Sequence, residues 1–136
     1  MSDAVPARVP ESVAIIGGGL AGFTTAQSLR ASGYTGTVTI IDPEGTPYDR
    51  PPLSKDYLAG KADAEQLGFV PADWYAENAV EVAPHRVDSI DPDSGIVRCA
   101  DGSRTQAEAI VLALGGRPRM LPVPGGDLPG LHVLRT

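Results

Sequence analysis

The sequence predicts an α/β fold in which a parallel sheet is built on a βαβ unit and carries a small antiparallel β insertion. Residues 12–16 form a short apolar run that ends in three glycines, as expected of a buried parallel strand followed by a tight turn. Residues 37–41 are β-branched throughout, which is typical of a second strand. The stretch from Leu20 to about Ser32 lies between them and fits a helix, with Gly33 placed to end it in a left-handed cap.

The rest of the chain alternates loops and short elements. Residues 1–11 are expected to form a flexible leader. Residues 43–71 are rich in Pro, Gly and polar side chains and predict a long loop with short helical turns, a length usually linked to function or disorder. The further elements that we expect are a short helix at 72–78, strands at 80–82, 86–90 and 96–99 with a hairpin connection at 91–95, and the apolar run 109–114 as a return to the parallel sheet.

Composition bounds the class of protein. With 136 residues, of which 42% are apolar and 21% charged, the chain is long enough to bury the core of one globular domain. Its net charge of −6 and its lack of Lys or Arg runs disfavour nucleic acid and anionic membrane surfaces as partners. No stretch reaches the ~20 apolar residues that span a bilayer, and the start of the chain lacks a signal-peptide pattern. We therefore expect a cytoplasmic protein without a membrane partner.

A single cysteine limits the chemistry further. Cys99 has no partner for an internal disulfide, a CxxC redox pair or a cysteine-based zinc site, and we expect it to pack as a small apolar residue in a hairpin strand. His85 and His132 are far apart in sequence and lack spaced acidic or cysteine partners, so no metal site is predicted. Trp74 and Tyr75 are expected to pack the short helix. Any electron transfer needs a bound cofactor.

The strongest chemical signal is the pattern Gly17-x-Gly19-x-x-Gly22, which follows a predicted strand and opens a predicted helix. In this context Gly17 permits the tight turn, Gly19 leaves room for a pyrophosphate, and Gly22 lets the helix pack closely on the strand. The helix amino terminus offers unpaired N–H groups and a partial positive charge to the phosphates. Asp42 ends the second strand about twenty residues later, where the fingerprint places an acid that binds an adenosine ribose. A Rossmann-like dinucleotide site is predicted, the alternative being a glycine-rich turn that binds nothing.

Residues 47–61, with Arg-Pro-Pro-Leu-Ser-Lys at 50–55, closely resemble a loop of the FAD-dependent NAD(P)H ferredoxin reductases of bacterial oxygenase systems. That family includes putidaredoxin, rubredoxin and dioxygenase ferredoxin reductases. Residues 112–119 and 131–136 agree with the same family, so the resemblance runs from about Ser12 to Thr136. It implies that the first GxGxxG binds FAD, which the fingerprint alone does not separate from NAD. It also implies electron transfer from NAD(P)H through FAD to a ferredoxin-type iron–sulfur protein.

The resemblance implies roles for individual residues. Lys55 would lie near the isoalloxazine ring as the catalytic residue, with Arg50 close by, because a fixed cation stabilises the negative charge of the reduced ring. Without the resemblance, both would be interpreted as solvated loop charges. Val87 would meet the adenine side through its backbone, and Arg135 would make a polar contact with FAD. The implied cofactor-binding residues are Gly17, Gly19, Leu20, Ala21, Gly22, Asp42, Arg50, Lys55, Val87, Ala113, Gly115 and Arg135.

Two departures from the family pattern bear on binding. The loop between Asp42 and Pro47 is one residue shorter than usual, which makes Glu44 a lesser candidate for the ribose contact. Leu114 stands where the family usually has the Thr of Ala-Thr-Gly, which removes a hydroxyl beside the cofactor. The region that carries two redox cysteines in disulfide reductases has none here. Electrons would therefore leave the flavin directly for an external acceptor.

The resemblance also predicts how much of an enzyme is present. In the family the FAD-binding domain is discontinuous, and an NAD-binding domain is inserted after the segment that corresponds to residues 134–136. We therefore expect residues 12–136 to be the first segment of an FAD-binding domain, which is incomplete without later parts. Two alternatives stay open: a truncated or stand-alone FAD-binding module without catalytic activity, and a small NAD-binding Rossmann protein, against which residues 50–55 argue. The oligomeric state is not predicted.

Overall fold

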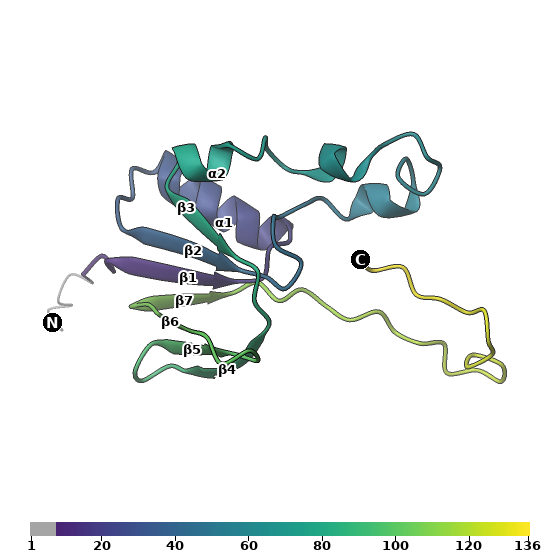
Figure 1. Ribbon diagram of the computed structural model, residues 1–136. Coiled ribbons are helices and arrows are strands. Elements are labelled where there is room, and N and C mark those ends of the chain that lie inside the picture. Colours follow the sequence, from purple (N-terminus) through teal and green to yellow (C-terminus); the bar gives the residue numbers. More distant parts are fainter. Residues whose placement is uncertain (1–7) are drawn as a thin grey trace, which may run out of the picture.

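A computed structural model describes residues 8–136 of the chain. Residues 1–7, most of the expected leader, lie outside the described residues. Arg8 donates hydrogen bonds to Glu11 at 2.7 Å and to Glu108 at 3.1 Å, which ties the start of the described chain to the segment before the last strand. The described residues form seven strands in two sheets and two α-helices (Figure 1). Across residues 8–136, none of the helices has the length and apolar character needed to span a membrane.

Four parallel strands form the main sheet, in the order β3-β2-β1-β7 (Figure 1). β1 (Ser12–Ile16) pairs with β2 (Thr37–Ile41) on one side and with β7 (Ala109–Leu112) on the other, in a register that sets Val13 opposite Ala109. β3 (Val80–Ala83) extends the sheet beyond β2. The run of apolar side chains in β1 and β2 is buried because both faces of the sheet are covered. The predicted parallel sheet is confirmed, although β7 ends two residues earlier than expected.

One face of the main sheet packs against helices (Figure 1). α1 (Leu20–Ala31) buries Phe23 and Ala26 against this face, and α2 (Trp74–Glu77) lies beside it. The Phe23 ring is stacked on Phe69 at 4.7 Å between ring centroids, and Trp74 and Tyr75 complete the aromatic cluster. The expectation that Trp74 and Tyr75 pack the short helix is therefore confirmed.

The other face of the main sheet packs against a small antiparallel sheet. This sheet consists of β4 (Val87–Asp91), β5 (Ile96–Cys99) and β6 (Arg104–Gln106). Val97 and Cys99 of β5 are buried in one cluster with Ala14 and Ile16 of β1. Cys99 is thus an interior packing residue, as predicted. β6 was not expected from its polar sequence, because it is a strand only through its pairing with β5.

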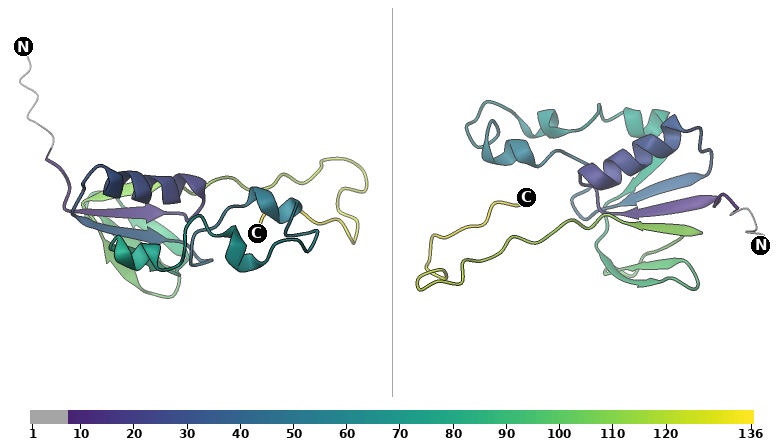
Figure 2. Two further views of the ribbon diagram at one scale, coloured as in Figure 1. Left: turned by 90° about the horizontal axis from the view of Figure 1, so that it is seen from above. Right: turned by 180° about the vertical axis from the view of Figure 1, so that it is seen from behind.

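Two irregular segments extend beyond the carboxyl ends of the parallel strands (Figures 1 and 2). One is the predicted long loop, 43–71, which contains two 3-10 helices, Pro51–Ser54 and Ala64–Leu67, and an isolated antiparallel bridge between Tyr48 and Gly68. The other is residues 113–136, called here the carboxyl-terminal arm, which has no helix or strand. Both segments begin at the carboxyl ends of parallel strands, on the side of the sheet where the glycine turn also lies.

Candidate functional site

The first and last fingerprint glycines are required by the packing of the chain itself. Gly17 has a φ of 110°, and a Cβ there would overlap the carbonyl oxygen of Ala113. A Cβ at Gly22 would overlap the carbonyl oxygen of Gly17 and lie 3.3 Å from Ile15 Cγ2. The positive φ of Gly17 is the tight turn that the sequence predicts, and the contact at Gly22 is the predicted close packing of α1 on β1. The close approach of Ala113 to Gly17 was not predicted.

Gly19 differs because its missing side chain faces a cavity. Its φ of −73° is open to any residue, and a Cβ there would meet only Arg50 Nη1, at 3.0 Å. Gly19 is the N-cap of α1, and the first helical hydrogen bond runs from the Phe23 N–H to the Gly19 carbonyl at 3.0 Å. The N–H groups of the first turn have no intrahelical partner and carry the partial positive charge of the helix start. This end of α1 is suited to an anion.

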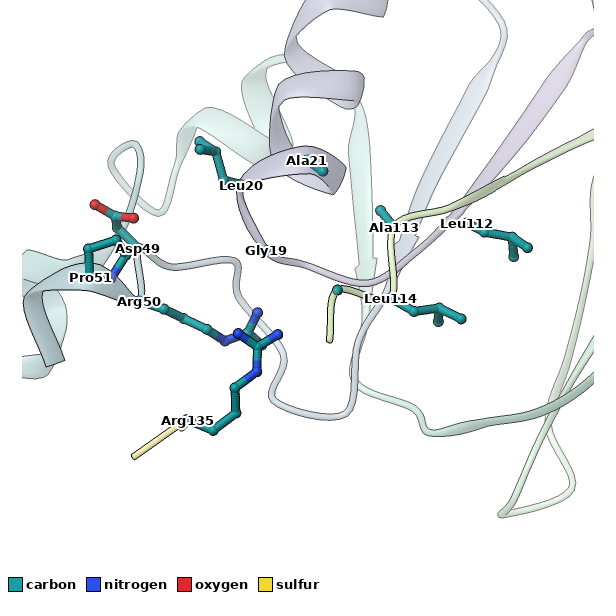
Figure 3. A pocket seen from close by; sticks show the side chains of 11 residues that line it. Gly19, Leu20, Ala21, Asp49, Arg50, Pro51, Leu112, Ala113, Leu114 and Arg135 are labelled. Carbon is teal, nitrogen blue, oxygen red and sulfur yellow. The ribbon is translucent and has the colours of Figure 1, made fainter. Parts of the chain in front are cut away.

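The cavity beside Gly19 has a volume of about 560 Å³, within the range typical of small-molecule sites. It lies where the carboxyl end of β7, the start of α1 and the 43–71 loop meet (Figure 3). Ligands of open α/β sheets bind beyond the carboxyl ends of the parallel strands, as here. The lining residues are Gly19, Leu20, Ala21, Asp49, Arg50, Pro51, Leu112, Ala113, Leu114, Gly115 and Arg135.

Two guanidinium groups reach the cavity from distant parts of the sequence (Figure 3). Arg50 comes from the 43–71 loop, and Arg135 from the carboxyl-terminal arm, where its Nη2 lies 2.6 Å from the position of a Cβ at Gly115. The Arg50 Nε atom is buried and has no hydrogen-bond partner among the described residues. Converging positive charges and a buried unpaired donor favour an anionic ligand, because guanidinium groups bind phosphate oxygens through several donors.

Asp42 is placed beside the glycine turn by two backbone hydrogen bonds. Its Oδ2 accepts from the Gly18 N–H at 2.7 Å and its Oδ1 from the Glu44 N–H at 2.8 Å. The residue is only 7% exposed, so its carboxylate is held in one orientation. Each carboxylate oxygen can accept a further hydrogen bond, for example from a ribose hydroxyl.

Glu44, the other candidate for a ribose contact, has its side chain engaged elsewhere. Its Oε2 accepts a hydrogen bond from the Tyr48 hydroxyl at 2.6 Å, and its Oε1 forms an ion pair with Arg50 Nη2 at 3.1 Å. Burial raises the pKa of the Tyr48 phenol, and the hydrogen bond to Glu44 raises it further. Tyr48 therefore remains a donor at neutral pH. Sequence reasoning missed these contacts, because they depend on the path of the loop.

Two predicted site residues, Lys55 and Val87, neither line the cavity nor belong to the glycine turn beside it. Lys55 is exposed at the end of the Pro51–Ser54 3-10 helix. Val87 begins β4 and packs, half-buried, against the cluster that contains Val97 and Cys99. Their roles toward a cofactor stay predictions. The structure does bring together the other predicted residues, which either line the cavity or, in the case of Gly17, Gly22 and Asp42, shape the turn beside it.

Four lining residues were absent from the predicted set. Asp49 and Pro51 flank Arg50 in the run that resembles the reductase loop, and this neighbourhood was the signal that could have found them. Leu112 and Leu114 flank Ala113 and are 62% and 65% exposed. In Figure 3 both of these side chains point away from the two guanidinium groups.

Comparison with known proteins identifies the family of the chain. The family described as pyridine nucleotide-disulphide oxidoreductase matches residues 11–136. The ferredoxin–NAD(+) reductase subunit of the benzene 1,2-dioxygenase system of Pseudomonas putida is 48% identical over 91% of this chain and 30% of its own length. Rhodocoxin reductase of Rhodococcus erythropolis is 44% identical over 92% of the chain and 30% of its own length. The chain thus spans about 30% of the length of these curated relatives.

A solved structure gives the same result at the level of the fold. The ferredoxin reductase for the CYP199A2 system from Rhodopseudomonas palustris is similar with a TM-score of 0.84 and 41% identity, over 93% of this chain and 31% of that one. The similarity therefore extends over most of the chain.

Proposed function

Because the chain belongs to the pyridine nucleotide-disulphide oxidoreductase family, we propose that it forms the FAD-binding part of an enzyme that passes electrons from NAD(P)H through FAD to a ferredoxin-type iron–sulfur protein. The observation that carries this proposal is the open Gly19 position, which lies between the start of α1 and two guanidinium groups. Such a position accepts a pyrophosphate against the backbone, as a dinucleotide requires.

The residues present fit FAD. The pyrophosphate would bind the first-turn N–H groups of α1, with Arg50 and Arg135 as its counter-charges, and the ribose hydroxyls would donate to Asp42. When bound, FAD supplies the acceptance of a hydride and the release of electrons. The contribution of this chain is to hold and orient the cofactor, because positioning accounts for much of the catalysis in hydride transfer.

The electron donor and acceptor are proposed from the names of relatives. The benzene dioxygenase subunit is named a ferredoxin–NAD(+) reductase, and one similar solved structure holds putidaredoxin reductase in a covalent complex with putidaredoxin. Disulfide exchange by this chain is disfavoured, because its one cysteine, Cys99, is buried and has no partner. A cytoplasmic location belongs to the same proposal. The other candidate is a module that binds FAD without catalysing electron transfer.

The test is cofactor selectivity. The purified chain is incubated with FAD, FMN or NAD⁺ and passed through a gel-filtration column, and flavin absorption or nucleotide content of the protein peak is measured. We expect FAD to be retained, FMN to be lost because it has no adenosine diphosphate half, and ADP to compete with FAD. Retention of NAD⁺ in place of FAD would overturn the assignment of the cavity.

A further inference from the structure

In the 43–71 loop, three side chains contact one another pairwise: those of Glu44, Tyr48 and Arg50. Glu44 accepts a hydrogen bond from Tyr48 at 2.6 Å and pairs with Arg50 Nη2 at 3.1 Å, so each of its two oxygens holds one partner. The Arg50 guanidinium also lies 5.6 Å from the centre of the Tyr48 ring, within the range of a cation–π contact. Both charged side chains are partly buried, with 24% exposure for Arg50 and 33% for Glu44.

This set does not use Arg50 Nη1, the donor that lies beside Gly19. Glu44 contacts Nη2 alone, whereas Nη1 points to Gly19 and Nε is buried without a hydrogen-bond partner among the described residues. The Glu44 backbone N–H also donates to Asp42 Oδ1 at 2.8 Å. One residue therefore connects the acid proposed for the ribose with the guanidinium proposed for the pyrophosphate.

We infer that Glu44 is a positioning residue for the anion site and holds the Arg50 guanidinium over Gly19 without contacting the ligand itself. The inference rests on the proposed function, because it assumes that the ligand is the pyrophosphate of a nucleotide. An arginine side chain has many rotamers, and one that is already anchored loses less conformational freedom when it binds a phosphate.

The direction in which one substitution changes the affinity for ADP distinguishes a positioning role of Glu44 from a purely electrostatic one. Glu44→Gln removes a negative charge near the bound anion, and electrostatics alone would then make ADP bind more tightly. If Glu44 positions Arg50, the affinity for ADP falls instead, by about threefold to tenfold, as for other coupled neighbours. Adenosine, which has no phosphate, should bind the variant with unchanged affinity. NMR titration of the 136-residue chain measures both ligands.

Two further variants serve as controls in the same ADP titration. Glu65→Gln removes the same charge from the same loop without touching Arg50, and it should leave the affinity for ADP unchanged. In an Arg50→Lys background, Glu44→Gln should cause no additional loss, because the residue through which it acts has already been altered. An equal loss of ADP and adenosine affinity in Glu44→Gln would indicate a general structural role and would overturn the inference.

A measurement without ligand tests the inference independently of the proposed function. The buried Arg50 Nε–H should give an NMR signal that exchanges slowly with water and is assigned by its loss in Arg50→Lys. We expect this signal in the wild type and in Glu65→Gln, and its loss in Glu44→Gln. A wild type that binds no ADP contradicts the proposed function, and the signal then still decides the inference. Persistence of the signal in Glu44→Gln, or tighter ADP binding by that variant, overturns the inference alone.

Discussion

Gly19 and Gly22 lie three residues apart, yet a side chain would have different consequences at the two positions. At Gly22 a Cβ would strike the backbone of Gly17, so a substitution there acts on folding. At Gly19 the φ is ordinary and a Cβ would meet only the end of a flexible arginine. The Gly19 position therefore reports on ligand binding with little disturbance of the fold.

Gly19→Val should abolish FAD binding, because its side chain would occupy the space of the pyrophosphate. The variant should stay folded, with a loss of roughly 1 kcal/mol or less at the N-cap. Flavin retention after gel filtration and thermal unfolding measure the two effects. Gly116→Ala is the matched control, since a Cβ there meets no atom within 4 Å. Stoichiometric FAD in Gly19→Val would show that the phosphate turn is assigned wrongly.

Lys55 should tune the bound flavin more than hold it. Lys55→Met is expected to lower the flavin midpoint potential, because a cation near the reduced ring would be lost. Spectroelectrochemical titration of the FAD-loaded complete enzyme measures the change. Lys61→Met, at another exposed position in the same loop, should leave the potential unchanged. An unchanged or raised potential in Lys55→Met would identify Lys55 as an ordinary loop residue.

The glycine roles could be predicted from the sequence because spacing and flanking elements determine them. The Glu44 contacts could not, since they require the loop to bring residues 44, 48 and 50 onto one side, and no periodic pattern records that path. Arg135 is an intermediate case. The family resemblance predicted a polar contact of Arg135 with FAD. The position of Arg135 beside Gly115, in contrast, depends on the path of the carboxyl-terminal arm.

At the scale of elements, Arg30 joins the end of α1 to the turns before β2 and β3. Its Nη1 donates to the Tyr34 and Gly36 carbonyls at 2.8 and 2.9 Å. Its Nε and Nη2 donate to the Asn78 and Ala79 carbonyls, each at 2.8 Å. One side chain therefore satisfies four carbonyls from two separate turns.

Arg30→Met should lower the free energy of unfolding by about 2 kcal/mol, because hydrogen bonds to a charged donor contribute more than neutral ones. Urea unfolding followed by circular dichroism measures the loss. Arg104→Met, on the exposed edge strand β6, serves as the control and should change the midpoint little. Equal midpoints for the two variants would contradict the role assigned to Arg30.

The elements were predictable to different degrees. β1, α1 and β2 have apolar or β-branched runs with a glycine turn between the first two, so their local signals agree with their tertiary contacts. β6 reads Arg-Thr-Gln and becomes a strand only by pairing with β5. β7 ends at Leu112 although the apolar run continues, and Gly115, with a φ of 67°, then lies in the segment that lines the cavity.

At the scale of the whole molecule, the site depends on parts that the sequence keeps far apart. The glycine turn follows β1, Arg50 comes from the long loop, and Arg135 lies near the last residue, yet all three meet at one edge of the sheet (Figure 3). The topology makes this possible because β7 returns to pair with β1. The cavity is thus formed only when β7 has paired with β1.

These 136 residues alone should not oxidise NAD(P)H at an enzymatic rate. Hydride transfer requires the nicotinamide to be held roughly 3–3.5 Å from the flavin, and the single GxGxxG pattern of this sequence is already assigned to FAD. The chain, and a version extended by a homologous carboxyl-terminal part, are each supplied with excess FAD, NADH and ferricyanide. Equal turnover by the two would contradict this prediction and require a nicotinamide site within the chain. Stable FAD binding without turnover would favour the module that lacks catalysis.

The pairing of β1 with β7 has a consequence for biosynthesis. β1 is the first of the described strands to leave the ribosome, but β7, the neighbour on its second side, is the last of them to be made. At about 5–20 residues per second, the nascent chain would carry an open apolar strand edge for several seconds after β2 has emerged. Such an edge is a template for pairing with other chains and a target for chaperones. The yield of native protein should therefore depend on translation speed and chaperone supply as well as on the stability of the finished sheet.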